Sequence, residues 1–347
     1  MIDYVVPIRC ASCTRDAHDE LIDHLATLGG VARVIVADGS RADVARTHAE
    51  RFGPVATHVE VQPTSLNGKV DGVREGLRHA THERVVIADD DVRYSVDGLL
   101  AVADALAGCD LVIPQNVFPG ETMPWHARWD TARTLVNRAL GTDYPGTLAV
   151  RRSAFEAAGG YDGDVLFENL ELIRTIEAAG GLVRARPDLF VVRLPPTSER
   201  FFEQRVRQAY DDFARPARLA AALATLPLVI GAIRRRRWVW LAASGAAAIG
   251  LAEVGRRRAD GASHIPAAAS CFAPVWILER GVTSWLAVAS RVVLGGCVYR
   301  GTVIRRAATP RRELRRRRRA RRRGSRRTAA WSGTDRTDIT ARPLAAG

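Results

Sequence analysis

Short apolar runs alternate with amphipathic stretches from the N-terminus to about residue 114. The apolar runs predict buried strands at residues 4–8, 31–37, 55–61, 84–88 and 111–114. Between them, apolar residues recur with helical periodicity and predict helices at 16–28, 41–51, 68–80 and 95–107. Strands and helices that alternate at this spacing are typical of a doubly wound, mostly parallel sheet. This part of the chain is therefore expected to be α/β.

The alternation continues to residue 216, with longer helices. It predicts further strands at 146–152 and 189–194, and helices at 125–140, 152–158, 168–179 and 198–215. Gly180 and Gly181 follow the third of these helices, and Pro216 ends the last. We therefore expect one α/β domain over residues 1–216.

The composition changes sharply after residue 216. Three mostly apolar runs follow at 217–233, 238–255 and 264–299, and arginine clusters separate them. The runs are close to the roughly 17–20 residues that cross a bilayer, and tryptophans lie near their ends or breaks. A membrane-associated helical region over 217–304 is expected, with a soluble helical domain as the alternative. Arginines flank the second run at both ends, which a shallow hairpin would accommodate better than a simple crossing.

The positive charge of the chain is concentrated near its C-terminus. Residues 300–327 hold fifteen Arg and one Glu, a local +14 that leaves −1 for the rest of a chain with a formal charge of +13. We expect residues 305–347 to form a disordered, Arg-rich tail that binds anionic lipid headgroups at the cytoplasmic face. Interleaved aromatic residues and a recognition motif are lacking, so no nucleic-acid partner is expected.

The five cysteines form no even, regular framework, which favours a reducing compartment. Cys10 and Cys13 have CxxC spacing, but the sequence shows neither a second CxxC nor a neighbouring pair of histidines, which argues against a metal or redox site. The first residues, MIDYVVPIR, do not resemble a signal peptide. We therefore expect a protein of the cell membrane with its α/β domain in the cytoplasm.

Three consecutive acids, Asp89, Asp90 and Asp91, end the apolar run 84–88. Ligands of α/β sheets bind just beyond the carboxyl ends of the strands. Alternate residues of an extended segment point the same way, so Asp89 and Asp91 are expected to face one ion or one ribose while Asp90 faces elsewhere. Neighbouring carboxylates repel each other unless a cation neutralises them, so Asp89 and Asp91 are predicted to bind Mg²⁺ or Mn²⁺. A solvated acidic turn is the alternative.

Three other segments are expected at the same edge of the sheet. Pro7 ends the first strand, and Asp38, which precedes Gly39 and Ser40, can accept hydrogen bonds from a nucleobase or sugar. Asn67-Gly68-Lys69 opens a helix, where a helix N-terminus and the only lysine of the chain suit a diphosphate. The GxxxxGK[ST] spacing of a P-loop is absent. A base pocket, a phosphate cradle and a metal site together indicate a nucleotide-diphosphate donor site.

The chain resembles the family 2 glycosyltransferases with a GT-A fold, and most closely their membrane-attached, ceramide-glucosyltransferase-like members. The resemblance covers residues 3–215 and extends to 276–280 and 295–301. Its motifs, in chain order, are Val5-Val-Pro7, Ala37-Asp-Gly-Ser40, Asn67-Gly-Lys69, Ala88-Asp-Asp-Asp91, Gly146-Thr147 with Arg151-Arg152, Phe167-Glu-Asn-Leu-Glu-Leu172 and Gln204-Arg-Val-Arg207.

The resemblance implies a role for several of these residues. Asp38 matches the acid that contacts the nucleotide base. Asp89 and Asp91 match the DxD motif, with Asp91 on the metal and Asp89 near the ribose or a metal-bound water. Gln204 and Arg207 match the first and fourth positions of the (Q/R)xxRW motif, which holds the diphosphate and the acceptor. Pro7, Lys69 and Asp90 are expected beside the donor.

Two positions depart from the family pattern. Gln208 stands where the (Q/R)xxRW motif has Trp, which removes a stacking surface for an acceptor sugar and argues against a processive synthase. Asn169 stands where the family has its catalytic Asp, and an amide cannot abstract a proton. Glu168 and Glu171 are the remaining candidates for the base.

These observations predict a hexosyltransferase that uses a divalent metal and a nucleotide sugar, with UDP-sugars favoured. The apolar C-terminal runs suggest a lipid or lipid-linked acceptor, and the expected chemistry inverts the anomeric centre. A catalytically impaired membrane protein that binds sugar nucleotides is the main alternative, supported by Asn169. A nucleotidyltransferase is less favoured because residues 9–13 are not the Gly-rich, basic loop that such enzymes usually carry after the first strand.

Overall fold

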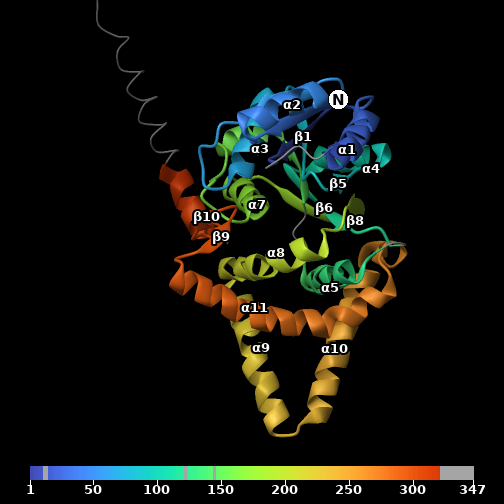
Figure 1. Ribbon diagram of the computed structural model, residues 1–347, viewed down its shortest axis with the longest axis vertical. Helices are drawn as coiled ribbons and strands as arrows, with labels where there is room; N and C mark the ends of the chain where they lie inside the picture. The colour runs from blue at the N-terminus through green and yellow to red at the C-terminus, as the bar shows by residue number, and fades with distance from the viewer. Residues whose placement is uncertain (11–14, 121–122, 144–145, 321–347) are drawn as a thin grey trace, which may run out of the picture.

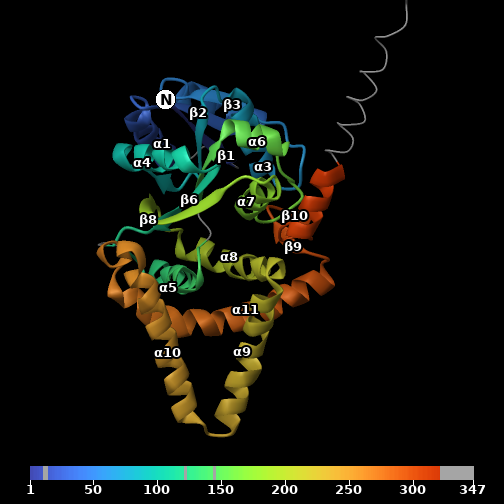
Figure 2. The same cartoon turned by 180° about the vertical axis from the view of Figure 1, so that it is seen from behind.

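The computed structural model describes residues 1–10, 15–120, 123–143 and 146–320. An α/β body lies at one end of the molecule, and two long helices, α9 and α10, extend from the other end (Figure 1). Seen from behind, the same two helices form a V below helix α11, which crosses beneath the body (Figure 2). The molecule thus separates a sheet-based part from a helical part, as the composition change at residue 217 predicts.

The body is built on one sheet with the strand order β3-β2-β1-β4-β7-β6-β8-β5. Strands β1 to β4 are parallel, whereas β7 runs antiparallel to both of its neighbours. The strands are β1 (Ile2–Ile8), β2 (Ala32–Asp38), β3 (Thr57–Glu60), β4 (Arg84–Ala88), β5 (Val92–Arg93), β6 (Leu111–Val117), β7 (Thr147–Arg151) and β8 (Val183–Arg193). The predicted α/β class with a large, mostly parallel sheet is confirmed.

Helices cover both faces of this sheet, because the strands β1, β2, β4, β6 and β7 carry apolar side chains on both sides. One core cluster includes Leu25 of α1 and Leu99 of α4, and the other includes Val73 of α3 and Ile176 of α7. The helices of the body are α1 (Arg15–Leu28), α2 (Ala42–Phe52), α3 (Gly68–His79), α4 (Val96–Asp104), α5 (Trp125–Leu140), α6 (Arg152–Ala158), α7 (Glu168–Ala178) and α8 (Ser198–Tyr210), with 3₁₀ turns η1 (Ala105–Gly108) and η2 (Asp211–Ala214).

Helix α3 lies unusually close to strand β1. A Cβ atom on Gly76 would come within 2.3 Å of Val5 Cγ1, so only glycine permits this approach. At the start of the helix, the Asn67 side chain accepts a hydrogen bond from the Lys69 amide and caps the first turn. The cap and the close packing together fix Lys69 at the carboxyl edge of the sheet.

The helical part consists of α9 (Pro216–Arg234), α10 (Trp238–Arg257), η3 (Arg258–Ser263), η4 (Ala267–Phe272) and α11 (Ala273–Val293). The helix α9 and the stretch Trp238–Ser263 are long and apolar enough to cross a membrane, and only 6% and 17% of their apolar windows are buried. The third apolar run of the sequence is divided among η4, α11 and a hairpin of β9 (Cys297–Tyr299) and β10 (Thr302–Ile304).

The segment 305–320 is ordered, contrary to the expectation of a disordered tail from residue 305. Its backbone pairs with the body, because Leu166 N donates to the Arg306 carbonyl at 2.9 Å and Thr309 N donates to Glu171 Oε2 at 2.6 Å. Residues 311–320 are helical, and Arg311 and Arg317 pair with Glu177 and Asp162. Body carboxylates therefore order the start of the Arg-rich stretch, and residues 321–347 lie outside the described part of the chain.

Candidate active site

Two pockets of about 150 Å³ each meet at Asp89, Glu168 and Arg207, which line both of them. The first pocket is bounded by the ends of β1 and β4, the start of α3 and the β9–β10 turn. Its lining includes Pro7, Arg9, Gly68, Lys69, Asp90, Tyr299, Arg300 and Thr302. The second pocket is bounded by α7, α8 and the helical part. Its lining includes Asn137, Asn169, Arg193, Gln204, Gln208, Asp211, Asp212, Arg218 and Arg280.

A cluster of charged side chains lies where the pockets meet. Lys69 Nζ is 2.5 Å from Glu168 Oε1 and also pairs with Asp89. Burial lowers the pKa of Lys69, but the two carboxylates more than offset this effect and raise it above its ordinary value. Burial raises and Lys69 lowers the pKa of Glu168, and the net direction is down. Lys69 is therefore a cation and Glu168 an anion at neutral pH.

Asp89 and Asp91 face the same cation, although Asp90 and Asp91 lie in a turn, closed by a hydrogen bond from Val92 N to the Asp89 carbonyl, rather than in the expected extended segment. Arg193 Nε is 2.9 Å from Asp91 Oδ2, and an Arg193 terminal nitrogen is 3.5 Å from Asp89 Oδ2. Asp90 is exposed instead and lines the first pocket. Arg193 at the end of β8 was not anticipated, since nothing in the sequence places this strand beside the acidic triplet.

The residues of this corner fit a divalent cation. Asp91 Oδ1 is buried and has no hydrogen-bond partner among the described residues. Burial raises the pKa of Asp89 even with Lys69 and Arg193 beside it. The unpartnered oxygen is available to a cation, and carboxylate oxygens are the ligands that Mg²⁺ and Mn²⁺ prefer.

Asp38 does not reach either pocket, contrary to the expected contact with a nucleobase. Its side chain is fully buried, with His48 Nδ1 at 2.6 Å and His58 Nε2 at 3.1 Å from Oδ2. The Ser40 amide donates to Oδ1 at 2.8 Å. Burial raises the pKa of Asp38, but these hydrogen bonds more than offset it and hold the pKa well below the ordinary range. The carboxylate is therefore occupied by two histidines from α2 and β3.

Glu168 and Glu171 lie in different environments although one helical turn separates them. Glu168 lines both pockets, whereas Glu171 lines neither and is fully buried. Glu171 Oε2 accepts the hydrogen bond from Thr309 N that holds the C-terminal segment. Glu171 is therefore placed to stabilise the fold rather than to contact a substrate, and only Glu168 keeps the position expected of a base.

The remaining expected residues line the pockets. Pro7 borders the first pocket and Gln204 the second, and the Arg207 guanidinium lies 5.2 Å from the ring centroid of Tyr299. Tyr299 and Arg300 were not anticipated as pocket residues because Tyr299 ends the apolar run 264–299 and Arg300 follows it, in the segment that was assigned to the membrane-associated region. The Gly-Gly before Cys297 and the Gly after Arg300 were the available signal for a turn.

Paired carboxylates in the second pocket were also missed. Asp211 and Asp212 form the 3₁₀ turn η2 after α8. Burial, followed by the neighbouring Asp212, raises the pKa of Asp211 to about 6. In the sequence these residues form an Asp-Asp pair that begins four residues after Arg207. They were missed because the stretch has the pattern of a solvent-exposed helix end.

No protein-family model and no curated protein matches the chain. Among solved structures, it is similar to the mannosyltransferase PcManGT from Pyrobaculum calidifontis in complex with GDP-Man and Mn²⁺, with 20% identity, a TM-score of 0.50 and coverage of 82% of this chain and 86% of that one. This likeness shows that the chain has the fold of GT-A glycosyltransferases, as expected from the sequence motifs.

Two further solved structures are similar to a smaller part of this chain. TarS 1–349 from S. aureus, in complex with UDP-GlcNAc, has 14% identity, a TM-score of 0.40 and coverage of 60% and 65%. Glucosyl-3-phosphoglycerate synthase from Mycobacterium tuberculosis, in complex with Mn²⁺, UDP and glucosyl-3-phosphoglycerate, has 19% identity, a TM-score of 0.37 and coverage of 58% and 74%.

Proposed function

We propose that the protein transfers a hexosyl group from a nucleoside-diphosphate sugar to a lipid or lipid-linked acceptor. One observation carries the proposal: Asp89, Glu168 and Arg207 line both pockets, so opposite charges meet where a donor and an acceptor would react. The first pocket takes the donor and the second takes the acceptor. The solved structure with the same fold holds GDP-Man and Mn²⁺, which supports a donor of this class.

The first pocket suits a diphosphate because several cations converge on it. Arg9, Lys69, Arg207 and Arg300 line its wall, and guanidinium and ammonium groups are the usual partners of phosphate oxygens. Asp89 and Asp91 would hold Mg²⁺ or Mn²⁺. A cation bound there supplies electrostatic stabilisation of the charge that grows on the departing nucleoside diphosphate.

Glu168 is the group that we assign as the general base. The acceptor hydroxyl oxygen attacks the anomeric carbon from the face opposite the diphosphate, and a new C–O bond forms with inversion. The bond from the anomeric carbon to the phosphate oxygen breaks, and its electron pair leaves with the diphosphate. Glu168 takes the hydroxyl proton, which requires the ionised carboxylate that Lys69 maintains.

The helical part is proposed to attach the enzyme to a membrane. Exposed apolar residues recur along α11 with helical spacing, at Val275, Leu278, Val282, Trp285 and Leu286. The opposite face of α11 packs on α5 and α8 of the body. Helices α9 and α10 project from α11 with apolar surfaces that are mostly exposed (Figure 1). An amphipathic helix in the interface and a hairpin immersed in lipid account for this distribution.

A lipid acceptor follows from where the second pocket lies. Arg218 of α9 and Arg280 of α11 line it together with Gln204 of α8. Helices proposed to contact the membrane therefore form one wall of the acceptor pocket. We infer from this arrangement a member of the membrane-attached, ceramide-glucosyltransferase-like group, with the body on the cytoplasmic face and the Arg-rich C-terminal segment near anionic headgroups.

A membrane protein that binds nucleotide sugars without transferring them is the second candidate. Asn169 favours it, because it lines the second pocket at the position where the family has its catalytic Asp. Slow hydrolysis of the donor by the purified protein separates the two functions, since a binding protein releases no sugar.

The proposed function is tested by incubating membranes that contain the protein with radiolabelled UDP- and GDP-sugars and then extracting lipids. We expect label from one donor to enter the lipid fraction in the presence of Mn²⁺, and membranes with the Asp91→Ala protein to give none. Label that reaches lipid equally with both proteins would contradict the assignment.

A further inference from the structure

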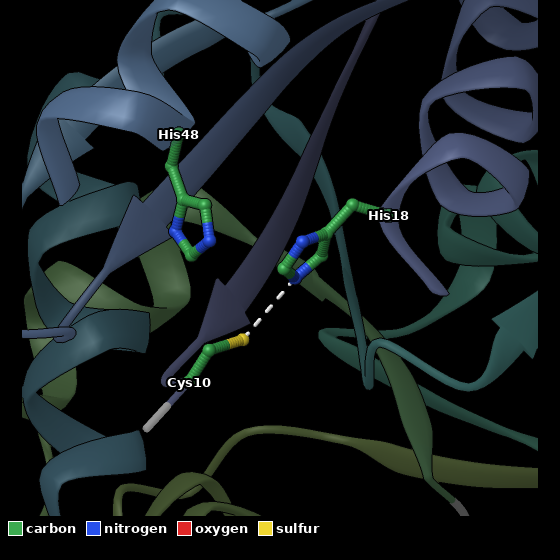
Figure 3. A group of neighbouring side chains, drawn as sticks. All are labelled: Cys10, His18 and His48. Atoms are coloured by element: carbon green, nitrogen blue, oxygen red, sulfur yellow. Dashed lines mark hydrogen bonds between the residues drawn. The ribbon is translucent and has the colours of Figure 1, made fainter. Parts of the chain in front are cut away.

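Cys10, His18 and His48 converge at the end of strand β1, although they belong to three different elements (Figure 3). Cys10 follows β1, His18 lies on α1 and His48 lies on α2. One potential ligand atom from each lies within 4.8 Å of the other two, and Cys10 Sγ is 3.3 Å from His18 Nε2. The sequence gives no hint of this group because His18 and His48 are not spaced as a ligand pair.

His48 is oriented by a carboxylate. Its Nδ1 lies 2.6 Å from Asp38 Oδ2, and an ionised carboxylate only accepts hydrogen bonds, so Nδ1 carries the proton. The Nε2 atom then has a lone pair. In the described part of the chain this Nε2 is buried without a hydrogen-bond partner, which normally costs free energy. In Figure 3 the ring presents this side toward His18.

We propose that Cys10 Sγ, His18 Nε2 and His48 Nε2 bind a Zn²⁺ ion, with water as the fourth ligand. A thiolate and two imidazoles are a donor set that zinc prefers in tetrahedral geometry. Ligand atoms of such a site are separated by about 3.5 Å, given bond lengths of about 2.3 Å to sulfur and 2.0 Å to nitrogen. The Cys10–His18 pair already has this separation, and small side-chain movements bring His48 into range.

Asp38 supports the proposed site by accepting a hydrogen bond from the His48 nitrogen that does not bind the metal. A metal-bound histidine usually donates its other N–H to a carboxylate, which fixes the ring and its tautomer. The pair Asp38–His48 has this arrangement and explains why Asp38 is buried away from both pockets. Zinc binding replaces the thiol proton of Cys10, so affinity is expected to rise with pH.

The ion would join three elements beside the first pocket. Cys10 directly follows Pro7, Ile8 and Arg9, which line that pocket, and the Cys10 amide donates to Ser40 Oγ at 2.9 Å. The site is chemically distinct from the Asp89–Asp91 corner, because sulfur and nitrogen donors select zinc-like metals whereas carboxylates select Mg²⁺ or Mn²⁺. It therefore stands whether or not the protein transfers sugars.

The proposal is tested by titrating the full, untagged chain in detergent with Co²⁺ after removal of bound metal with a chelator. We expect a thiolate-to-cobalt charge-transfer band that saturates at one ion per chain and disappears when Zn²⁺ is added. The Cys10→Ser protein should lose the band, and Asp38→Asn should weaken Zn²⁺ binding about 10- to 100-fold, as second-layer changes commonly do.

Two matched variants make the result specific. Cys271→Ser removes an exposed thiol on η4 and should leave the band unchanged. Asp91→Asn removes a carboxylate of the other corner and should also leave it unchanged. Thermal unfolding verifies that Cys10→Ser is folded. Absence of the band in the parent protein, or its full retention in Cys10→Ser, overturns the proposal.

Discussion

The charged cluster around Asp89 and the hairpin formed by α9 and α10 expose opposite chemistries. In the cluster, Asp89 and Glu168 each pair with Lys69 at the meeting point of two pockets. In the hairpin, large apolar side chains lie in the open, with Leu228 at 70% and Val239 at 81% exposure. Water-soluble proteins usually avoid both features, the packed charges of the cluster and the exposed apolar side chains of the hairpin.

The charged cluster and the hairpin are therefore complementary to different external partners. A cation would stabilise buried carboxylates that have an unpartnered oxygen. A lipid bilayer would stabilise exposed apolar helices. The second pocket is where the two requirements meet, since Arg218 and Arg280 come from the helical part. Each of the following experiments perturbs one region and asks whether the other is affected.

The largest effect is expected from Asp91→Asn. Removing the negative charge that would hold the cation should lower the rate of transfer by about 10²–10³-fold or more. Enzymes that lose one group that stabilises charge in the transition state show an effect of this size. Membrane attachment should not change. Asp104→Asn, an exposed acid that pairs with Arg84 at the other end of β4, is the control for kinetics with labelled donor. Equal rates in the two variants would contradict the role of the corner.

Glu168→Gln should reduce kcat by about 10²-fold or more while KM for the donor changes little, because the amide keeps the shape but takes no proton. Glu171→Gln is the matched comparison from the same helix. One side-chain oxygen still accepts from Thr309 N, but the new N–H₂ group takes the place of Oε1, which is buried without a partner among the described residues, so the melting temperature should fall while kcat is nearly unchanged. The assignment fails if Glu171→Gln shows the larger loss of kcat in steady-state kinetics.

The hairpin is tested by the double variant Leu228→Glu and Val239→Glu. Each carboxylate costs about 2.5–3.5 kcal/mol in a lipid-immersed helix, so we expect the membrane-bound fraction to fall roughly tenfold or more. Leu140→Glu, on the body, changes a residue with similar exposure of 74% and should leave the fraction unchanged. Flotation with vesicles measures this, and donor hydrolysis in solution should persist in the double variant.

The smallest effect concerns stability against pH in the second pocket. Because the pKa of Asp211 is raised to about 6 in the folded state, the folded protein binds more protons than the unfolded chain between about pH 4 and 6. The stability of the parent protein should therefore fall as pH rises through this range. Asp211→Asn removes the dependence and should be more stable by up to about 3 kcal/mol at pH 8, with no gain at pH 4.

Melting curves of both proteins in detergent at these two pH values provide the measurement. A gain for Asp211→Asn that is the same at both values would show that the carboxylate does not titrate as described.

Much of the fold was readable from the sequence because it rests on local periodicity. The run 84–88 is a strand with those bounds, and 125–140 is a helix with those bounds. The shared orientation of Asp89 and Asp91, in contrast, comes from a turn at residues 89–92 and not from the alternation of side chains in an extended segment. A short strand such as β5, with two residues, has too little pattern to be recognised.

The parts that were missed depend on contacts between distant segments. Tyr299 and Arg300 reach the first pocket from the far end of the chain, and Thr309 binds Glu171 across 138 positions. His48 and His58 come to Asp38 from α2 and β3, which no spacing rule connects. Such arrangements arise from tertiary packing. The motif around Asp38 therefore predicted that this residue lies at the edge of the sheet, but it did not predict the two histidines that surround its carboxylate.

We expect Asp89 and Asp91 to hold a cation beside a nucleoside diphosphate in the first pocket. Anomalous diffraction from crystals grown with Mn²⁺ and UDP or GDP tests it most directly. We expect a manganese peak next to both carboxylates and against the diphosphate oxygens. A nucleotide bound in this pocket with no manganese at the two aspartates would contradict the account.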